Sequence, residues 1–149
     1  LMPQTVWNIE TAVWDKIDAT SAITTLVGKG NSSRAFPEVR FDGAVRPCIV
    51  YELASSRPFQ TLSGSPTLVF STIAIHCMGD TKIQAVNLAR KVQDAFQEWS
   101  GTWYDGATLK LTVSGGRTST ITTDYLAPTD GATYGLFVST VEVTCFHTN

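Results

Sequence analysis

The sequence has few charged residues. Asp, Glu, Lys and Arg make up 16% of the 149 residues, against about 25% in a typical soluble domain. The formal net charge is −2, which argues against the basic face that nucleic-acid-binding domains present. A surface with so little charge is typical of proteins that partners partly cover, and equally of sheet surfaces rich in Ser and Thr.

Long hydrophobic runs and paired cysteines are also missing. No apolar run approaches the roughly 20 residues that a membrane-spanning helix needs, so we expect no membrane contact. Cys48, Cys77 and Cys145 lie singly inside predicted strands. An odd number without paired spacing favours buried free thiols in a reducing cytoplasm over a disulfide framework. The hydrophobic content of 43% argues against disorder and predicts one domain, residues 1–149, with a substantial core.

No motif has the spacing of a catalytic or metal-binding site. Cys145 and His147 share a face of the last predicted strand, but the neighbours His76 and Cys77 point to opposite faces of theirs. At most three ligands could therefore meet, without Cys-x-x-Cys spacing. In GKGNSS, residues 28–33, the lysine stands between the glycines, which does not match a P-loop. We expect no catalytic residue, no cofactor and no metal ion.

Apolar spacing predicts three helices. Residues 5–18 form the first, and a shorter one begins at Thr20 or Ser21 and ends at Gly28. The third covers residues 81–99, because Thr81 and Gln84 have the spacing of a capping box. Its apolar stripe consists of Ala85, Leu88, Ala89, Val92, Ala95, Phe96 and Trp99.

Alternation and turn-forming residues predict the rest of the chain. Residues 47–54 and 67–78 form a hairpin whose long tip is residues 55–66. We expect SGTWYDGA, residues 100–107, to be a turn and residues 29–46 to be a long loop. The remaining predicted strands are 38–41 within that loop, 109–113, 118–126 and 132–146.

The strand at residues 67–78 has two apolar faces. Val69, Ile73, Ile75 and Cys77 share one face, and Leu68, Phe70, Ala74 and Met78 share the other. A strand in a half-solvated antiparallel sheet is apolar on one face only. The helices can cover one of these faces. The second is covered either by neighbouring copies and adjoining proteins, or by a second layer built from the 29–46 loop.

Four segments, taken in order, resemble the tail-completion proteins of long-tailed bacteriophages. The segment AVWDKIDATSAITTLVG resembles the opening helices of the family, and RPCIVYELASSRP resembles its first core strand. The central strand and helix are similar in STIAIHCMGDTKIQAVNLARKVQDAF, and the closing hairpin in TTDYLAPTDGATYGLFVSTVEVTCF. The resemblance extends over about residues 6–146 and concerns pattern and order, without an invariant motif.

The resemblance implies an α+β fold: a small, mainly antiparallel sheet with helices packed on one face and a long β-hairpin tip. It also implies a structural virion protein of the tail and neck, assembled in the cytoplasm of the bacterial host. Such proteins form a hexameric ring that ends the tail tube and joins the tail to the head. Their partners are the tail-tube protein and head or neck connectors, and DNA passes through the ring without sequence-specific binding.

The candidate assembly surface combines the second face of the central strand with the hairpin tip. It consists of Arg57, Phe59, Leu62, Leu68, Phe70, Ala74 and Met78. Two other functions stay open. The protein could be another neck, head–tail connector or tail-tube subunit, or it could be a small enzyme or ligand-binding domain that uses His76, His147 and Cys145.

Overall fold

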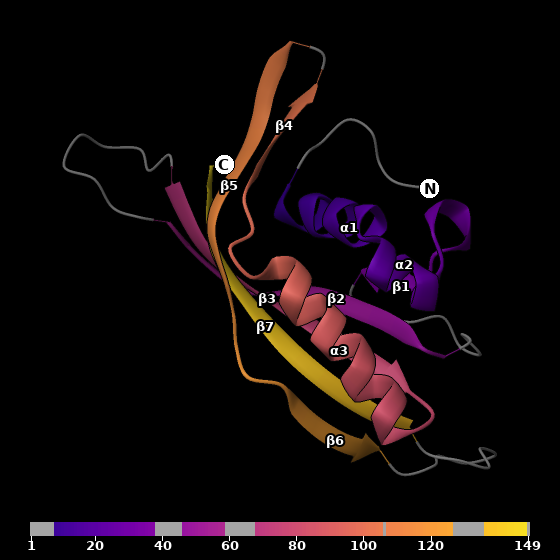
Figure 1. Cartoon of the computed structure of the whole chain (residues 1–149). Helices are drawn as coiled ribbons and strands as arrows, with labels where there is room; N and C mark the ends of the chain where they lie inside the picture. The colour runs from indigo at the N-terminus through magenta and orange to yellow at the C-terminus, as the bar shows by residue number, and fades with distance from the viewer. Residues whose placement is uncertain (1–7, 38–45, 59–67, 106, 127–135, 149) are drawn as a thin grey trace.

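The computed structural model describes residues 8–37, 46–58, 68–105, 107–126 and 136–148, and it has an α+β fold (Figure 1). The fold class predicted from the sequence is confirmed. The strand order is β1-β2-β3-β7-β5-β4, and β6 pairs with β7. Among the strands that the structure describes, β1 and β2 are parallel and the other pairs are antiparallel. The helices are α1 (Ile9–Ala19), α2 (Ser21–Val27) and α3 (Lys82–Phe96), and the strands are β1 (Ala35–Pro37), β2 (Cys48–Pro58), β3 (Leu68–Gly79), β4 (Gly101–Asp105), β5 (Thr108–Thr118), β6 (Thr122–Leu126) and β7 (Leu136–Thr148).

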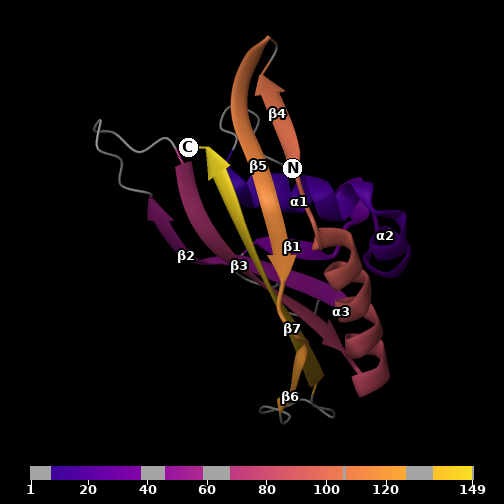
Figure 2. The same ribbon diagram turned by 60° about the vertical axis from the view of Figure 1, so that its left-hand side comes forward.

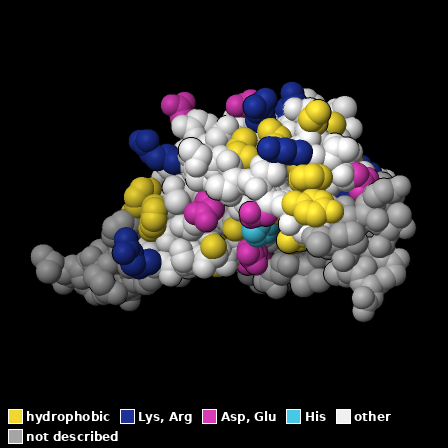
Figure 3. All heavy atoms as spheres, turned by 90° about the horizontal axis from the view of Figure 1, so that it is seen from below, with side chains coloured by type: hydrophobic (Ala, Val, Ile, Leu, Met, Phe, Trp, Pro, Cys, Tyr) yellow, Lys and Arg dark blue, Asp and Glu magenta, His cyan; other side chains and the backbone are white. Residues whose placement is uncertain are grey.

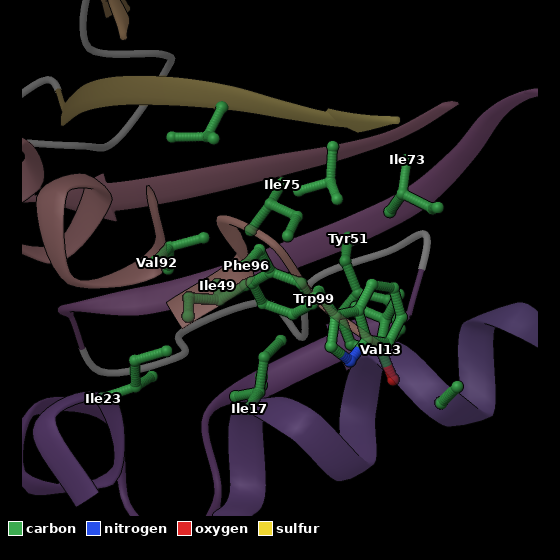
Figure 4. Packing of buried hydrophobic residues seen from close by; sticks show 14 of the residues in the cluster. Val13, Ile17, Ile23, Ile49, Tyr51, Ile73, Ile75, Val92, Phe96 and Trp99 are labelled. Atoms are coloured by element: carbon green, nitrogen blue, oxygen red, sulfur yellow. The ribbon is translucent and has the colours of Figure 1, made fainter. Parts of the chain in front are cut away.

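The three helices lie on one side of a curled sheet (Figure 1). Turning the molecule by 60° shows β4 and β6 at opposite ends (Figure 2). Side chains of β2 and β3 meet those of the helices in an apolar core (Figure 4). Its fully buried members include Val13, Ile17, Ile23, Ile49, Ile73, Ile75, Leu88, Val92 and Phe96. The predicted inner face of the central strand is therefore confirmed. No helix in the described ranges is long and apolar enough to cross a membrane.

Local capping explains where the helices begin and end. The Asn8 side chain accepts a hydrogen bond from the backbone N–H of Thr11 at 2.9 Å, which caps α1. Thr81 Oγ1 accepts from the N–H of Gln84 at 3.1 Å, as the capping box predicts. Gly28 ends α2 with a φ of 85°, a conformation that residues with a Cβ rarely adopt.

The prediction that α3 continues to residue 99 is wrong, because the helix ends at Phe96. The chain then turns toward β5: Glu98 has a φ of 61°, and its N–H donates to the carbonyl of Gly116 at 2.9 Å. The N–H of Gly116 donates in turn to the carbonyl of Trp99 at 3.1 Å. Trp99 still reaches the core, so the apolar stripe is correct although its last residue is not helical.

The prediction of a turn at residues 100–107 is also wrong, because Gly101–Asp105 forms β4 and pairs with β5. Glycines and an aspartate around two aromatic residues look locally like a turn. The strand forms because Trp103 has partners elsewhere in the chain. Trp103 packs on Trp99, with ring centroids 6.1 Å apart, and its Nε1–H donates to Asp15 of α1 at 3.0 Å.

The predicted hairpin is present, but its strands are longer than expected. β2 continues to Pro58, so residues 55–58 belong to the strand and not to the tip. Residues 59–66 of the predicted tip, and the strand predicted at 38–41, lie outside the described residues. Within the 29–46 loop the structure shows a 3₁₀ turn (Gly30–Ser32) and β1. The predicted strand at 118–126 is divided between the end of β5 and β6.

The three cysteines are buried, and we expect their thiols to be unreactive until the protein unfolds. Burial raises the pKa of Cys145 to about 12 and raises that of Cys77 further above its usual value. The folded protein therefore keeps both thiols protonated at pH values where the unfolded chain ionises, above about 8.5. Their contribution to stability is complete below that pH and is lost as the pH rises further. Labelling with a thiol reagent at pH 8, with and without urea, tests this, and labelling of two or more thiols in the native protein would contradict it.

Candidate assembly surface

The side of the sheet opposite the helices carries the even-numbered residues of β3 and their partners on β2 and β7. We call this side the outer face. In the strand register, Leu68 lies opposite Thr148, Phe70 opposite Phe146, Ala74 opposite Glu142 and Met78 opposite Val138. The alternation predicted from the sequence places all four candidate β3 residues on this face, as expected.

The candidate residues differ in how much surface they present. Leu68 is 40% exposed. Phe70 is half-buried, and its ring lies 5.1 Å from that of Phe146, centroid to centroid. Arg57 is exposed and lies opposite Phe70 on β2. Ala74 is only 6% exposed and Met78 is half-buried, so these two offer less surface to a partner. Phe59 and Leu62 lie outside the described residues.

The outer face is accordingly open toward the start of β3 and more closed toward its end. Three of its residues near the closed end, Cys48, Val50 and Val138, are buried. The 29–46 loop was the alternative cover for this face. Its described strand, β1, pairs edge to edge with β2 and so extends the sheet instead of forming a second layer. Residues 38–45, where a second layer would have to be built, lie outside the described residues.

A histidine held by two neighbours occupies the middle of the outer face. His76 Nε2 lies 3.2 Å from a carboxylate oxygen of Glu52, which can only accept, so Nε2 donates. Its Nδ1 lies 2.9 Å from Thr140 Oγ1. Figure 3 shows this side of the molecule, with a histidine among acidic side chains near the centre and basic and hydrophobic side chains toward the left. Glu142 is also exposed here.

The second histidine lies on the inner face, so the two do not share a site. His147 is 6% exposed, and its Nε2 lies 2.6 Å from Ser71 Oγ. Its Nδ1 lies 2.8 Å from the Thr148 carbonyl, which can only accept, so Nδ1 donates and Nε2 can accept from Ser71. A serine hydroxyl beside a histidine is the arrangement of a nucleophile and its base. Ser71 has no exposed surface, however, and a nucleophile must reach its substrate.

The decisive comparison is with protein families. The chain matches the family model described as Tail completion protein gp17 over residues 11–139. It belongs to this family. Among curated proteins, none matches the chain. Membership confirms the resemblance predicted from the sequence, and it makes this chain a phage tail-completion protein that contacts other tail and virion proteins.

This tail-completion protein also has two shallow hollows, at the junction of α3 with β5. They have volumes of about 380 Å³ and about 340 Å³, and the exposed Gln97 borders both. The Gln97 side chain accepts hydrogen bonds from the N–H and the hydroxyl of Thr118, at 3.2 and 2.8 Å. Neither hollow includes Ser71 or either histidine. Over the residues that the structure describes, no group of three His, Cys, Asp or Glu side chains could hold a metal ion.

The sequence alone could not show which residues of other strands lie beside the candidate residues of β3 on the outer face. Glu52, Glu142 and Phe146 stand on β2 and β7, far along the chain from β3, and only the strand register brings them beside Phe70 and Ala74. The available signal is the alternation of β7, in which Thr140, Glu142 and Thr144 are interleaved with buried residues.

Proposed function

We propose that this protein forms a hexameric ring that ends the tail tube and joins the tail to the head or neck. In this proposal residues 1–149 act as one domain without enzymatic activity. The ring contacts the tail-tube protein on one side and connector proteins on the other, and DNA passes through it without sequence-specific contacts. It is assembled in the host cytoplasm and functions in the virion. Family membership supports the role in the tail.

The single observation that supports contacts between copies is the open part of the outer face. Leu68 is exposed there beside the Phe70–Phe146 pair, on the side of the sheet away from the helices. Apolar and aromatic side chains are typical of the buried centres of protein interfaces. A closed ring uses two different patches on each subunit, and the low content of charge agrees with a surface that is largely covered after assembly.

We expect the wild-type protein to be a hexamer, either free or after addition to purified tail tubes. Light scattering gives the mass of the free form, and electron microscopy shows annular particles or capped tubes. A strict monomer in both preparations would contradict the ring.

Leu68→Asp is expected to prevent or strongly reduce hexamer formation, because it places a carboxylate in the open part of the outer face. The fold should survive, since Leu68 is 40% exposed. Ile83→Asp is the matched control, because Ile83 is 74% exposed on α3, on the other side of the sheet. If both variants assemble like the wild type, the outer face does not form the contact between copies.

A further inference from the structure

The charged residues of the outer face are separated by sign. In the strand register Arg57 lies in the row of Phe70, and Arg117 lies in the row of Thr72 and Thr144. Glu52 and Glu142 lie on either side of Ala74, further along β3, and Asp124 lies beyond them, opposite Val138. All five charged side chains are exposed. One half of the face is therefore basic and the other half acidic.

Arg57 and Glu142 lie too far apart to pair with each other within one copy, because they stand in the rows of Phe70 and Ala74. Phe70 and Ala74 are about 13 Å apart along β3, at about 3.3 Å per residue. Two ion pairs are present among the described residues, Arg46 with Asp80 and His76 with Glu52. In the same ranges, neither Arg57 nor Glu142 has an ion-pair partner. Within the described part of the chain, each copy therefore presents on one surface a cation and a carboxylate that are not ion-paired.

We propose that Arg57 of one copy binds beside Glu142 of the next copy in the ring. This inference rests on the proposed ring and specifies its contact. A heterologous interface joins two different patches, so the basic half of each outer face can meet the acidic half of its neighbour around a closed ring. Every copy then satisfies both of its charges. This complementarity makes a second copy of the chain the partner that fits the face.

The surroundings of the two residues fit such a contact. Of the two glutamates beside Ala74, Glu52 already accepts from His76, whereas Glu142 has no ion-pair partner among the described residues. Ala74 lies between these two glutamates in the register, so no long side chain separates them. The fork of a guanidinium donates two parallel hydrogen bonds to a carboxylate. Leu68 and Phe70 lie beside Arg57 and supply apolar contact around the pair.

Charge reversal tests this contact in the full chain. Arg57→Glu and Glu142→Arg are each expected to weaken ring formation at least about tenfold, because each places like charges together at every interface. The double variant restores the pair with its sign exchanged, and so does an equimolar mixture of the two single variants, in which the two kinds of subunit alternate. Hexamer formation is followed by light scattering at low salt, where exposed charges act most strongly.

Lys91→Glu and Asp94→Arg are the matched controls, since both residues are exposed on α3. Loss of rings in both single variants with recovery in the mixture supports the proposal. If the single variants form rings normally, or if the mixture of the two forms none, the proposed contact is wrong. Neither outcome contradicts the proposal that the wild type forms a ring. If the wild type forms no ring, the proposed function fails first. If Arg57→Glu does not fold, Arg57→Gln is tested in its place. The proposal then expects ring formation by Arg57→Gln to depend less on salt concentration than ring formation by the wild type, and an unchanged salt dependence overturns it.

Discussion

Phe96→Ala is expected to lower the free energy of unfolding by about 3–5 kcal/mol, the range for removing a fully buried aromatic side chain. Phe96 has no exposed surface and ends the apolar stripe of α3. Its ring meets that of Trp99 edge to face, with centroids 5.0 Å apart. The substitution leaves a cavity beside Trp99, whose ring packs in turn on Trp103. Trp103 is hydrogen-bonded to Asp15 of α1, so the loss also affects the contact between this cluster and α1.

Urea unfolding measures this loss, at one fixed protein concentration because assembly adds to apparent stability. Leu88→Ala, in the same stripe, should cost about 2–5 kcal/mol. Asn87→Ala is the control, since Asn87 is exposed on the opposite face of the helix, and it should change stability by about 0.5 kcal/mol or less. Similar losses for Asn87→Ala and Leu88→Ala would mean that the assigned face of α3 is wrong.

Gly116→Ala is expected to destabilise the protein by about 3 kcal/mol. A Cβ at this position would lie 2.6 Å from the Cβ of Trp99 and 2.7 Å from its backbone nitrogen. Backbone atoms cannot rotate away, so the end of α3 must separate from β5. Overpacking costs about 1–3 kcal/mol. The separation also weakens the two hydrogen bonds that join Gly116 to Glu98 and Trp99, at about 1 kcal/mol each.

The matched control is Ser114→Ala, because Ser114 is exposed on the same strand. It should change the midpoint of urea unfolding very little. If Gly116→Ala and Ser114→Ala have the same midpoint of urea unfolding, the prediction is wrong. The junction between α3 and β5 would then accommodate a Cβ without loss of stability.

Local sequence was sufficient to locate the helices and the central hairpin, although not all of their ends. The stripe and capping box of α3, and Gly28 at the end of α2, are signals carried by residues within one or two turns of each other. The strict alternation of β3 likewise assigned Leu68 and Phe70 to one face of the strand and Val69 to the other, without knowledge of any partner strand. These features depend on side-chain periodicity, which the chain specifies on its own.

Elements that depend on distant partners were mispredicted or misplaced. The segment that forms β4 has the composition of a turn and becomes a strand through pairing with β5 and the bond from Trp103 to Asp15. α3 ends at Phe96 because the backbone of Glu98 and Trp99 forms hydrogen bonds with Gly116. No local sequence pattern predicts these bonds. Strand ends at Pro58 and Thr148 exceed the predictions for the same reason, since pairing across the sheet extends them.

For the surface, the sequence determined that β3 has two apolar sides and that the chain resembles the tail-completion family, which the family match confirmed. Only the tertiary structure decided which distant residues join the second side. The register of β2, β3 and β7 brings Glu52 and Glu142 to either side of Ala74 and places Arg57 opposite Phe70. It also separates His76 from His147 on opposite faces of the sheet. Register follows from pairing between strands far apart in the chain, so alternation within one strand can assign a face but cannot name the neighbours on it.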